Sequence, residues 1–160
     1  MRSVARVLTI VTMAVLGILI VCYAGTGLRP TVVEAQAQPA AEQVAAFEAI
    51  SVALKAGDMG SDQFKKVSEP DPSRYEMITY RVRVKNPGVL GAEWVRLKLT
   101  PTASDVALLA PNVDIGAFGT AEVTATLLTE AGGDVKRDVW IEYYILGSRM
   151  SAVASWSTNG

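Results

Sequence analysis

Tyr75–Lys85, with the sequence YEMITYRVRVK, is the stretch that decides the fold class. Every second residue from Ile78 to Val84 is apolar or aromatic, and the residues between them are threonine or arginine. This period of two places one set of side chains against a core and the other set in water. The stretch therefore predicts a β-strand with one buried face.

Similar stretches lie on both sides of it and are separated by turn-forming residues. Asn86-Pro87-Gly88 ends the first strand, and Gly147-Ser148 has the glycine-first order of a tight hairpin turn. Strands are expected at 50–55, 75–85, 93–100, 105–109, 120–129, 135–146 and 150–156. Because helical crossovers are missing, residues 47–157 are expected to form one all-β domain, a single antiparallel β-sandwich.

The end of the first clear strand also carries a short sequence pattern. Its residues are Val82, Val84, Asn86 and Gly88, in the order V-x-V-x-N-x-G. Because of this pattern and the order of the expected strands over residues 47–156, the chain resembles a known group of β-sandwich modules. These are the immunoglobulin-like and fibronectin-type-III-like modules that are anchored to bacterial membranes. The resemblance implies two packed sheets. The chain lacks the paired cysteines of antibody domains, and the resemblance transfers no binding residue.

The N-terminus is apolar over residues 7–24, which follow Arg2 and Arg6. As a helix this run is about 27 Å long, close to the thickness of a bilayer core. Residues 1–25 are therefore expected to be a signal anchor or transmembrane helix with membrane lipid as its partner. The basic residues before it predict a cytoplasmic N-terminus and an extracytoplasmic C-terminal domain.

A cleaved signal peptide is the alternative to an anchor. Ala35-Gln36-Ala37 has the A-x-A form that signal peptidase accepts, and cleavage near Ala37 would give a secreted protein. Residues 26–46 are rich in Ala, Gln and Glu and contain Pro30 and Pro39, so we expect a stalk. Its last part, around residues 40–47, is either a short helix or a solvated linker.

Composition excludes several classes of function. With no histidine, the chain lacks the usual general base and the imidazole ligand of zinc sites. Its one cysteine, Cys22, leaves the exported part without an intramolecular disulfide. A formal net charge of −1 gives no field that would attract nucleic acid. We therefore expect neither an enzyme nor a protein with a cofactor, a metal site or a nucleic-acid partner.

A candidate partner-binding surface follows from the outward residues of the strands at 93–100 and 135–146. If these strands are neighbours, their outward side chains meet, and exposed Trp and Tyr beside Arg are typical of protein-binding patches. Packing between the strands is the competing interpretation. The candidate residues are Trp94, Arg96, Trp140, Glu142 and Tyr144.

The function that best fits these features is a membrane-tethered, non-catalytic interaction module, a protein partner or scaffold in a complex of the cell envelope. Two alternatives stay open. The chain could bind peptide or glycan on the same Trp and Tyr surface. It could also be a subunit of a surface filament, with residues 32–46 donating a strand to the next subunit.

Overall fold

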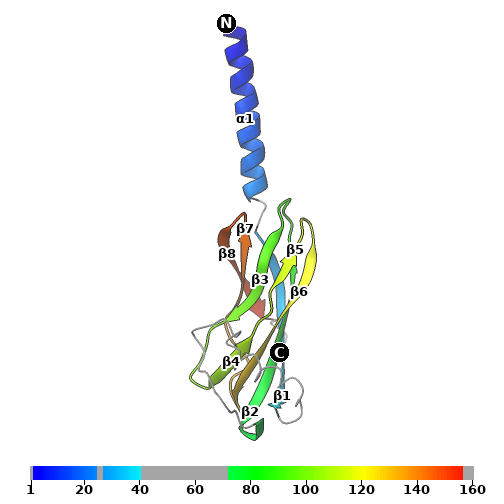
Figure 1. Ribbon diagram of the computed structural model, residues 1–160, viewed down its shortest axis with the longest axis vertical. Helices are drawn as coiled ribbons and strands as arrows, with labels where there is room; N and C mark the ends of the chain where they lie inside the picture. Colours follow the sequence, from blue (N-terminus) through cyan, green and yellow to red (C-terminus); the bar gives the residue numbers. More distant parts are fainter. Residues whose placement is uncertain (1, 25–26, 41–71, 157–160) are drawn as a thin grey trace.

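The computed structural model describes residues 2–24, 27–40 and 72–156. Helix α1 (Arg2–Ala24) projects from one end of a β-rich domain (Figure 1). A short 3-10 helix, η2 (Pro72–Arg74), precedes the second strand. The strands are β1 (Arg29–Pro39), β2 (Tyr75–Lys85), β3 (Ala92–Leu99), β4 (Asp105–Leu109), β5 (Val113–Ile115), β6 (Thr120–Glu130), β7 (Val139–Ile145) and β8 (Ser148–Trp156).

The strands form a single, strongly curled sheet in the order β4-β6-β2-β1-β8-β7-β3-β5. The β1–β8 pair is parallel, and the other neighbours in this order are antiparallel. The predicted immunoglobulin-like sandwich of two separate sheets is therefore wrong. The physical reason is that β1 hydrogen-bonds to β2 on one side and to β8 on the other, so the two predicted layers are one continuous sheet.

Strand β1 lies where the sequence predicts a solvated stalk. It pairs with β2 from Glu34 opposite Arg81 to Pro39 opposite Glu76, and with β8 at Val33 opposite Trp156. The composition of residues 29–39 does not indicate a strand, because alanine and glutamine produce little apolar alternation. Val33 is nevertheless buried. Residues 29–39 are thus an inner strand of the sheet.

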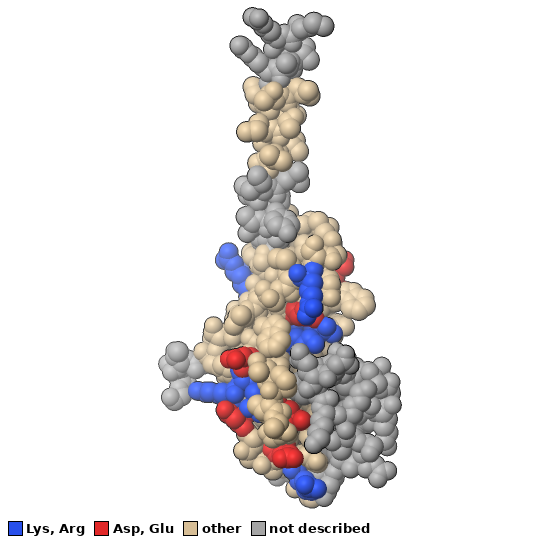
Figure 2. Space-filling model, turned by 90° about the vertical axis from the view of Figure 1, so that its left-hand side faces the viewer, with Lys and Arg blue, Asp and Glu red and all other residues tan. Residues whose placement is uncertain are grey.

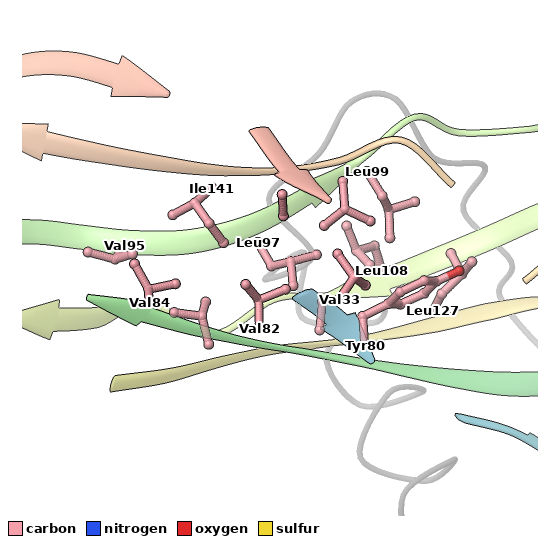
Figure 3. Packing of buried hydrophobic residues seen from close by; sticks show 14 of the residues in the cluster. Val33, Tyr80, Val82, Val84, Val95, Leu97, Leu99, Leu108, Leu127 and Ile141 are labelled. Carbon is pink, nitrogen blue, oxygen red and sulfur yellow. The ribbon is translucent and has the colours of Figure 1, made fainter. Parts of the chain in front are cut away.

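The core lies inside the curl of the sheet. Side chains of β3, such as Leu97, point toward those of β2, such as Val82, across the interior (Figure 3). The inward face predicted for β2 is confirmed, and alternate residues of β3, β6 and β7 are buried in the same way. These residues are Ile78, Tyr80, Val82, Val84, Val95, Leu97, Leu99, Val123, Ala125, Leu127, Val139, Ile141, Tyr143 and Ile145.

A buried ion pair joins the segment before β7 to the edge strand β4. Arg137 Nη2 lies 3.1 Å from Asp105 Oδ1, and both side chains are almost fully buried. The indole Nε1 of Trp156 donates to the carbonyl of Arg137 at 2.7 Å. Nearby, the hydroxyl of Tyr80 donates to the carbonyl of Val135 at 3.0 Å, and burial raises the pKa of Tyr80 to about 12. These contacts hold the two arms of the curled sheet together at the end far from α1.

Asn86 has the corresponding role at the end near α1. Its side-chain amide donates to the carbonyls of Leu90 at 2.7 Å and Gly116 at 3.0 Å, and its Oδ1 accepts from Gly88 N at 2.9 Å. The side chain is fully buried. Asn86 therefore fixes the β2–β3 loop against the β5–β6 loop, which gives the V-x-V-x-N-x-G pattern a structural explanation.

The predicted transmembrane helix is not supported. Within the described residues, no helix combines the length and the apolar character that crossing a membrane requires. The short helix or linker expected around residues 40–47 and the strand expected at 50–55 lie outside the described residues, apart from Ala40.

We predict that removing β1 abolishes cooperative folding, because β2 and β8 would lose the strand that joins them. A chain that begins at residue 39 should show no cooperative thermal transition by circular dichroism. A chain that begins at residue 27, which keeps β1, is the matched control and should melt cooperatively. Equal melting of the two proteins would contradict the role assigned to β1.

We also predict that Asn86→Ala lowers the free energy of unfolding by about 2–3 kcal/mol, because it leaves buried backbone groups without their partners. Chemical denaturation measures this difference. Asn112→Ala is the control, since Asn112 is exposed and its truncation should change stability by less than about 0.5 kcal/mol. A similar, small effect at both positions would show that Asn86 does not hold the loops.

Candidate functional site

A β-bulge in β3 organises the candidate site. The ladder pairs Glu93 with Tyr144 and next pairs Arg96 with Glu142, so β3 contains one residue more than β7 over this interval. The pairing of β3 with β5 shifts at the same place. Bulges of this kind bend a strand and redirect a side chain. Here the bulge contains Trp94.

Trp94 is held in an unusual backbone conformation. Its φ of 55° lies in the left-handed region, which large side chains rarely adopt. The backbone N–H of Trp94 donates to Asp114 Oδ1 at 2.8 Å, so a side chain of β5 fixes this conformation. The side chain is 63% exposed. The fold thus presents an indole to solvent rather than packing it.

Two hollows flank the exposed indole of Trp94, and Asn112 lines both. The larger has a volume of about 380 Å³ and is lined by Glu93, Trp94, Arg96, Asn112, Tyr144 and Gly147. The smaller, of about 210 Å³, is lined by Trp94, Asn112 and Asp114. A ligand in either hollow would therefore contact Trp94 together with polar side chains of the lining.

Glu142 fixes the arginines beside the larger hollow. Its carboxylate accepts from Arg96 Nε at 2.9 Å and from Arg149 Nη2, and the residue is only 2% exposed. Burial acts to raise the pKa of Glu142, but hydrogen bonds and charges of the two arginines outweigh it and hold this pKa below its usual value. Glu142 is therefore an ionised anchor for the arginines, and its own carboxylate is occupied.

The outer face of β3, β7 and β8 carries three cations beside the hollow. Lys98 lies two residues beyond Arg96 on β3, and Arg149 lies on β8. Burial, followed by the charge of Arg96, lowers the pKa of Lys98, although Glu142 opposes this effect. Glu142 offsets one of these three cations, and the exposed carboxylates of Glu93 and Asp114 at the hollows offset the other two, so the site carries both signs of charge.

The structure places the sequence-predicted site residues in three settings. Trp94, Arg96 and Tyr144 line the larger hollow, and Glu142 holds Arg96. Trp140 pairs with Lys98 further along the ladder, is half-buried and is not among the lining residues. Trp140 therefore lies outside the hollow itself.

Sequence reasoning missed Arg149, Asn112 and Asp114. The tight turn expected at Gly147-Ser148 is wrong, because Ile145 pairs with Ser148 and the two turn residues are Leu146 and Gly147, both at positive φ. The observed turn places Arg149 opposite Tyr144, whereas the expected turn would have placed it opposite Leu146. No comparable signal marks the other two residues. Asn112 and Asp114 lie at or beside a three-residue edge strand within a segment that has the composition of a loop.

Comparison with known proteins gives no family for this chain. It matches no model of a known protein family, and no curated protein sequence matches it. Within the described residues, no group of three or more His, Cys, Asp or Glu side chains is arranged to hold a metal ion. The assignment of a function therefore starts from the geometry around Trp94.

We predict that Glu142→Gln lowers the free energy of unfolding at pH 7 by about 1.5 kcal/mol, since it removes the charge that both arginines contact. The pKa of the Glu142 carboxyl is lower in the folded state than in the unfolded state, where it is near 4.5. The ionised carboxyl therefore stabilises the fold above about pH 4.5, and this stabilisation is lost as the pH falls through the pKa of the folded state. The difference between the two proteins should therefore shrink below about pH 4.5. Denaturation at several pH values measures it, and a difference that is independent of pH would contradict the assignment.

Proposed function

We propose that the domain is a non-catalytic protein-interaction module whose contact surface is centred on Trp94. The observation that carries this proposal is the exposed indole of Trp94, which lines two hollows and whose residue has a left-handed conformation at a β-bulge. Such a conformation costs about 1–3 kcal/mol for a non-glycine residue and clusters at functional sites. A large aromatic side chain that is exposed at this cost is best explained by a partner that covers it.

The surroundings of Trp94 favour as the partner a segment of a protein that carries both acidic and basic side chains. Trp, Tyr and Arg are the residue types that dominate binding energy at protein interfaces, and Trp94, Tyr144 and Arg96 meet at one hollow. Arg96 would attract carboxylates of the partner, and Glu93 and Asp114 would attract its cations. Glu93 contributes one carboxylate to the edge of the hollow and would help to orient the partner.

The module is proposed to act outside the cytoplasm, as part of a complex in the cell envelope. Arg2 and Arg6 followed by an apolar run are typical of export segments. Cleavage near Ala37 would remove most of β1 from the sheet, since Ala37 pairs with Ile78 in that strand. The exported form is therefore expected to keep residues 29–39.

The filament alternative loses its proposed donor strand. Residues 32–39 already pair with β2 and β8 of the same chain, so they are not free to complete a neighbouring subunit. A glycan-binding role would use the same aromatic surface. It is distinguished from a protein-binding role by titration with oligosaccharides while tryptophan fluorescence is recorded.

Two substitutions of Trp94 test the proposed function. Trp94→Ala should reduce capture of protein partners from solubilised extracts of the producing cells at least tenfold, as expected for the loss of a central aromatic contact. Val153→Ala is the control, because Val153 is exposed on the outer face of β8 and lies outside the hollow. Quantitative mass spectrometry measures the captured proteins.

Trp94→Gly separates a binding role from a packing role. Glycine adopts a positive φ without steric cost, so the free energy of unfolding should stay the same or rise while partner capture is lost. If Trp94 serves only to pack the domain, Trp94→Gly will lower stability. Unchanged capture by both variants would refute the proposal.

A further inference from the structure

The two hollows beside Trp94 differ in charge. The smaller hollow, of about 210 Å³, is lined among the described residues by one carboxylate, that of Asp114, and by no Lys or Arg side chain. The larger hollow is lined by both Glu93 and Arg96, whose charges balance. The smaller hollow therefore offers a net negative charge next to an indole.

A hydrogen bond holds the carboxylate of Asp114 beside Trp94. Its Oδ1 accepts the backbone N–H of Trp94 at 2.8 Å, across the paired strands β3 and β5. Asp114 is exposed, and no Lys or Arg in the described part of the chain forms an ion pair with it. An ionised carboxylate has about four acceptor positions. The bond to Trp94 thus orients this carboxylate and leaves most of its acceptor positions for a ligand.

Asn112 adds a second polar group to the smaller hollow. It is exposed, and the oxygen of its side-chain amide can accept a hydrogen bond. Trp94, Asp114 and Asn112 thus supply an aromatic ring, a carboxylate and an amide oxygen to one hollow. A guanidinium ion matches this set, because it stacks on aromatic rings and donates several hydrogen bonds from a rigid plane.

Long-range charge does not select the partner of this domain. The chain has a formal net charge of −1, and acidic and basic side chains are interspersed on the face drawn in Figure 2. Recognition of a charged partner therefore depends on individual charges close to the contact. At the smaller hollow, that charge is the carboxylate of Asp114.

We propose that the smaller hollow binds an arginine side chain of the partner, with its guanidinium against the indole of Trp94 and paired with Asp114. This inference rests on the proposed function, because it names the partner residue that Trp94 meets. The larger hollow shares Trp94 and Asn112 with the smaller one. A carboxylate close to that arginine in the partner would therefore contact Arg96, so the motif recognised combines an arginine with a nearby acidic residue.

Titration of the full chain in non-ionic detergent with N-acetylarginine amide tests the proposal. The indole N–H resonance of Trp94, assigned by its absence from Trp94→Ala, reports binding by NMR, and those of Trp140 and Trp156 are internal references. N-acetylcitrulline amide has nearly the same shape without the charge. It should bind about fivefold more weakly, which is the factor expected for one exposed cation contact worth about 1 kcal/mol.

Two substitutions of equal charge form the matched pair. Asp114→Asn keeps an acceptor for the N–H of Trp94 but removes the charge, so it should reduce binding of the arginine compound to the level of citrulline. Glu122→Gln removes an exposed carboxylate of β6 that lines neither hollow beside Trp94. It should bind the arginine compound as well as the original chain does.

Equal binding of the arginine and citrulline compounds would overturn the proposal, and so would equal loss of binding in Asp114→Asn and Glu122→Gln. A shift of the Trp94 resonance with a neutral oligosaccharide, but not with the arginine compound, would assign the hollow to glycan instead. Partner capture that depends on Trp94 but not on Asp114 refutes the arginine site and leaves the proposed function standing. Capture that depends on neither residue refutes the proposed function itself.

Discussion

The fold depends on the pairing of β1 between β2 and β8. Without this strand, two rows of backbone N–H and C=O groups would face each other unpaired across the middle of the sheet, which is costly for buried backbone. Satisfying them makes the sheet continuous and lets it curl around one core. The ion pair of Arg137 with Asp105 at one end and the amide of Asn86 at the other then fix how far the sheet curls.

Strands β2, β3, β4, β6, β7 and β8 were predictable because their information is local, whereas β1 and β5 were not predicted. In β2, alternation from Ile78 to Val84 identifies the element and its buried face, and the structure agrees residue by residue. The continuity of the sheet was not predictable, because it depends on which strands pair along their edges. Strand β1 has a weak apolar pattern and is stabilised mainly by its backbone ladder, so its sequence is that of a linker.

The candidate site shows the same division between local and non-local information. Alternation on β3 and β7 was enough to place Trp94, Arg96 and Tyr144 on one surface. It could not reveal the bulge, because one additional residue in a ladder leaves little trace in composition. Nor could it separate Trp140 from the hollow, since that depends on the register of two strands that lie far apart in the sequence.

The direct connection from α1 into β1 has a mechanical consequence. Tension applied between the helix and an attachment at the opposite end of the domain would run along β1, whose first residue follows α1 closely and whose last lies at that far end. Such a force is parallel to the strand and loads the hydrogen bonds between β1 and β2 together, in shear, rather than opening them one after another. The architecture is therefore suited to transmitting load between two attachments without unfolding.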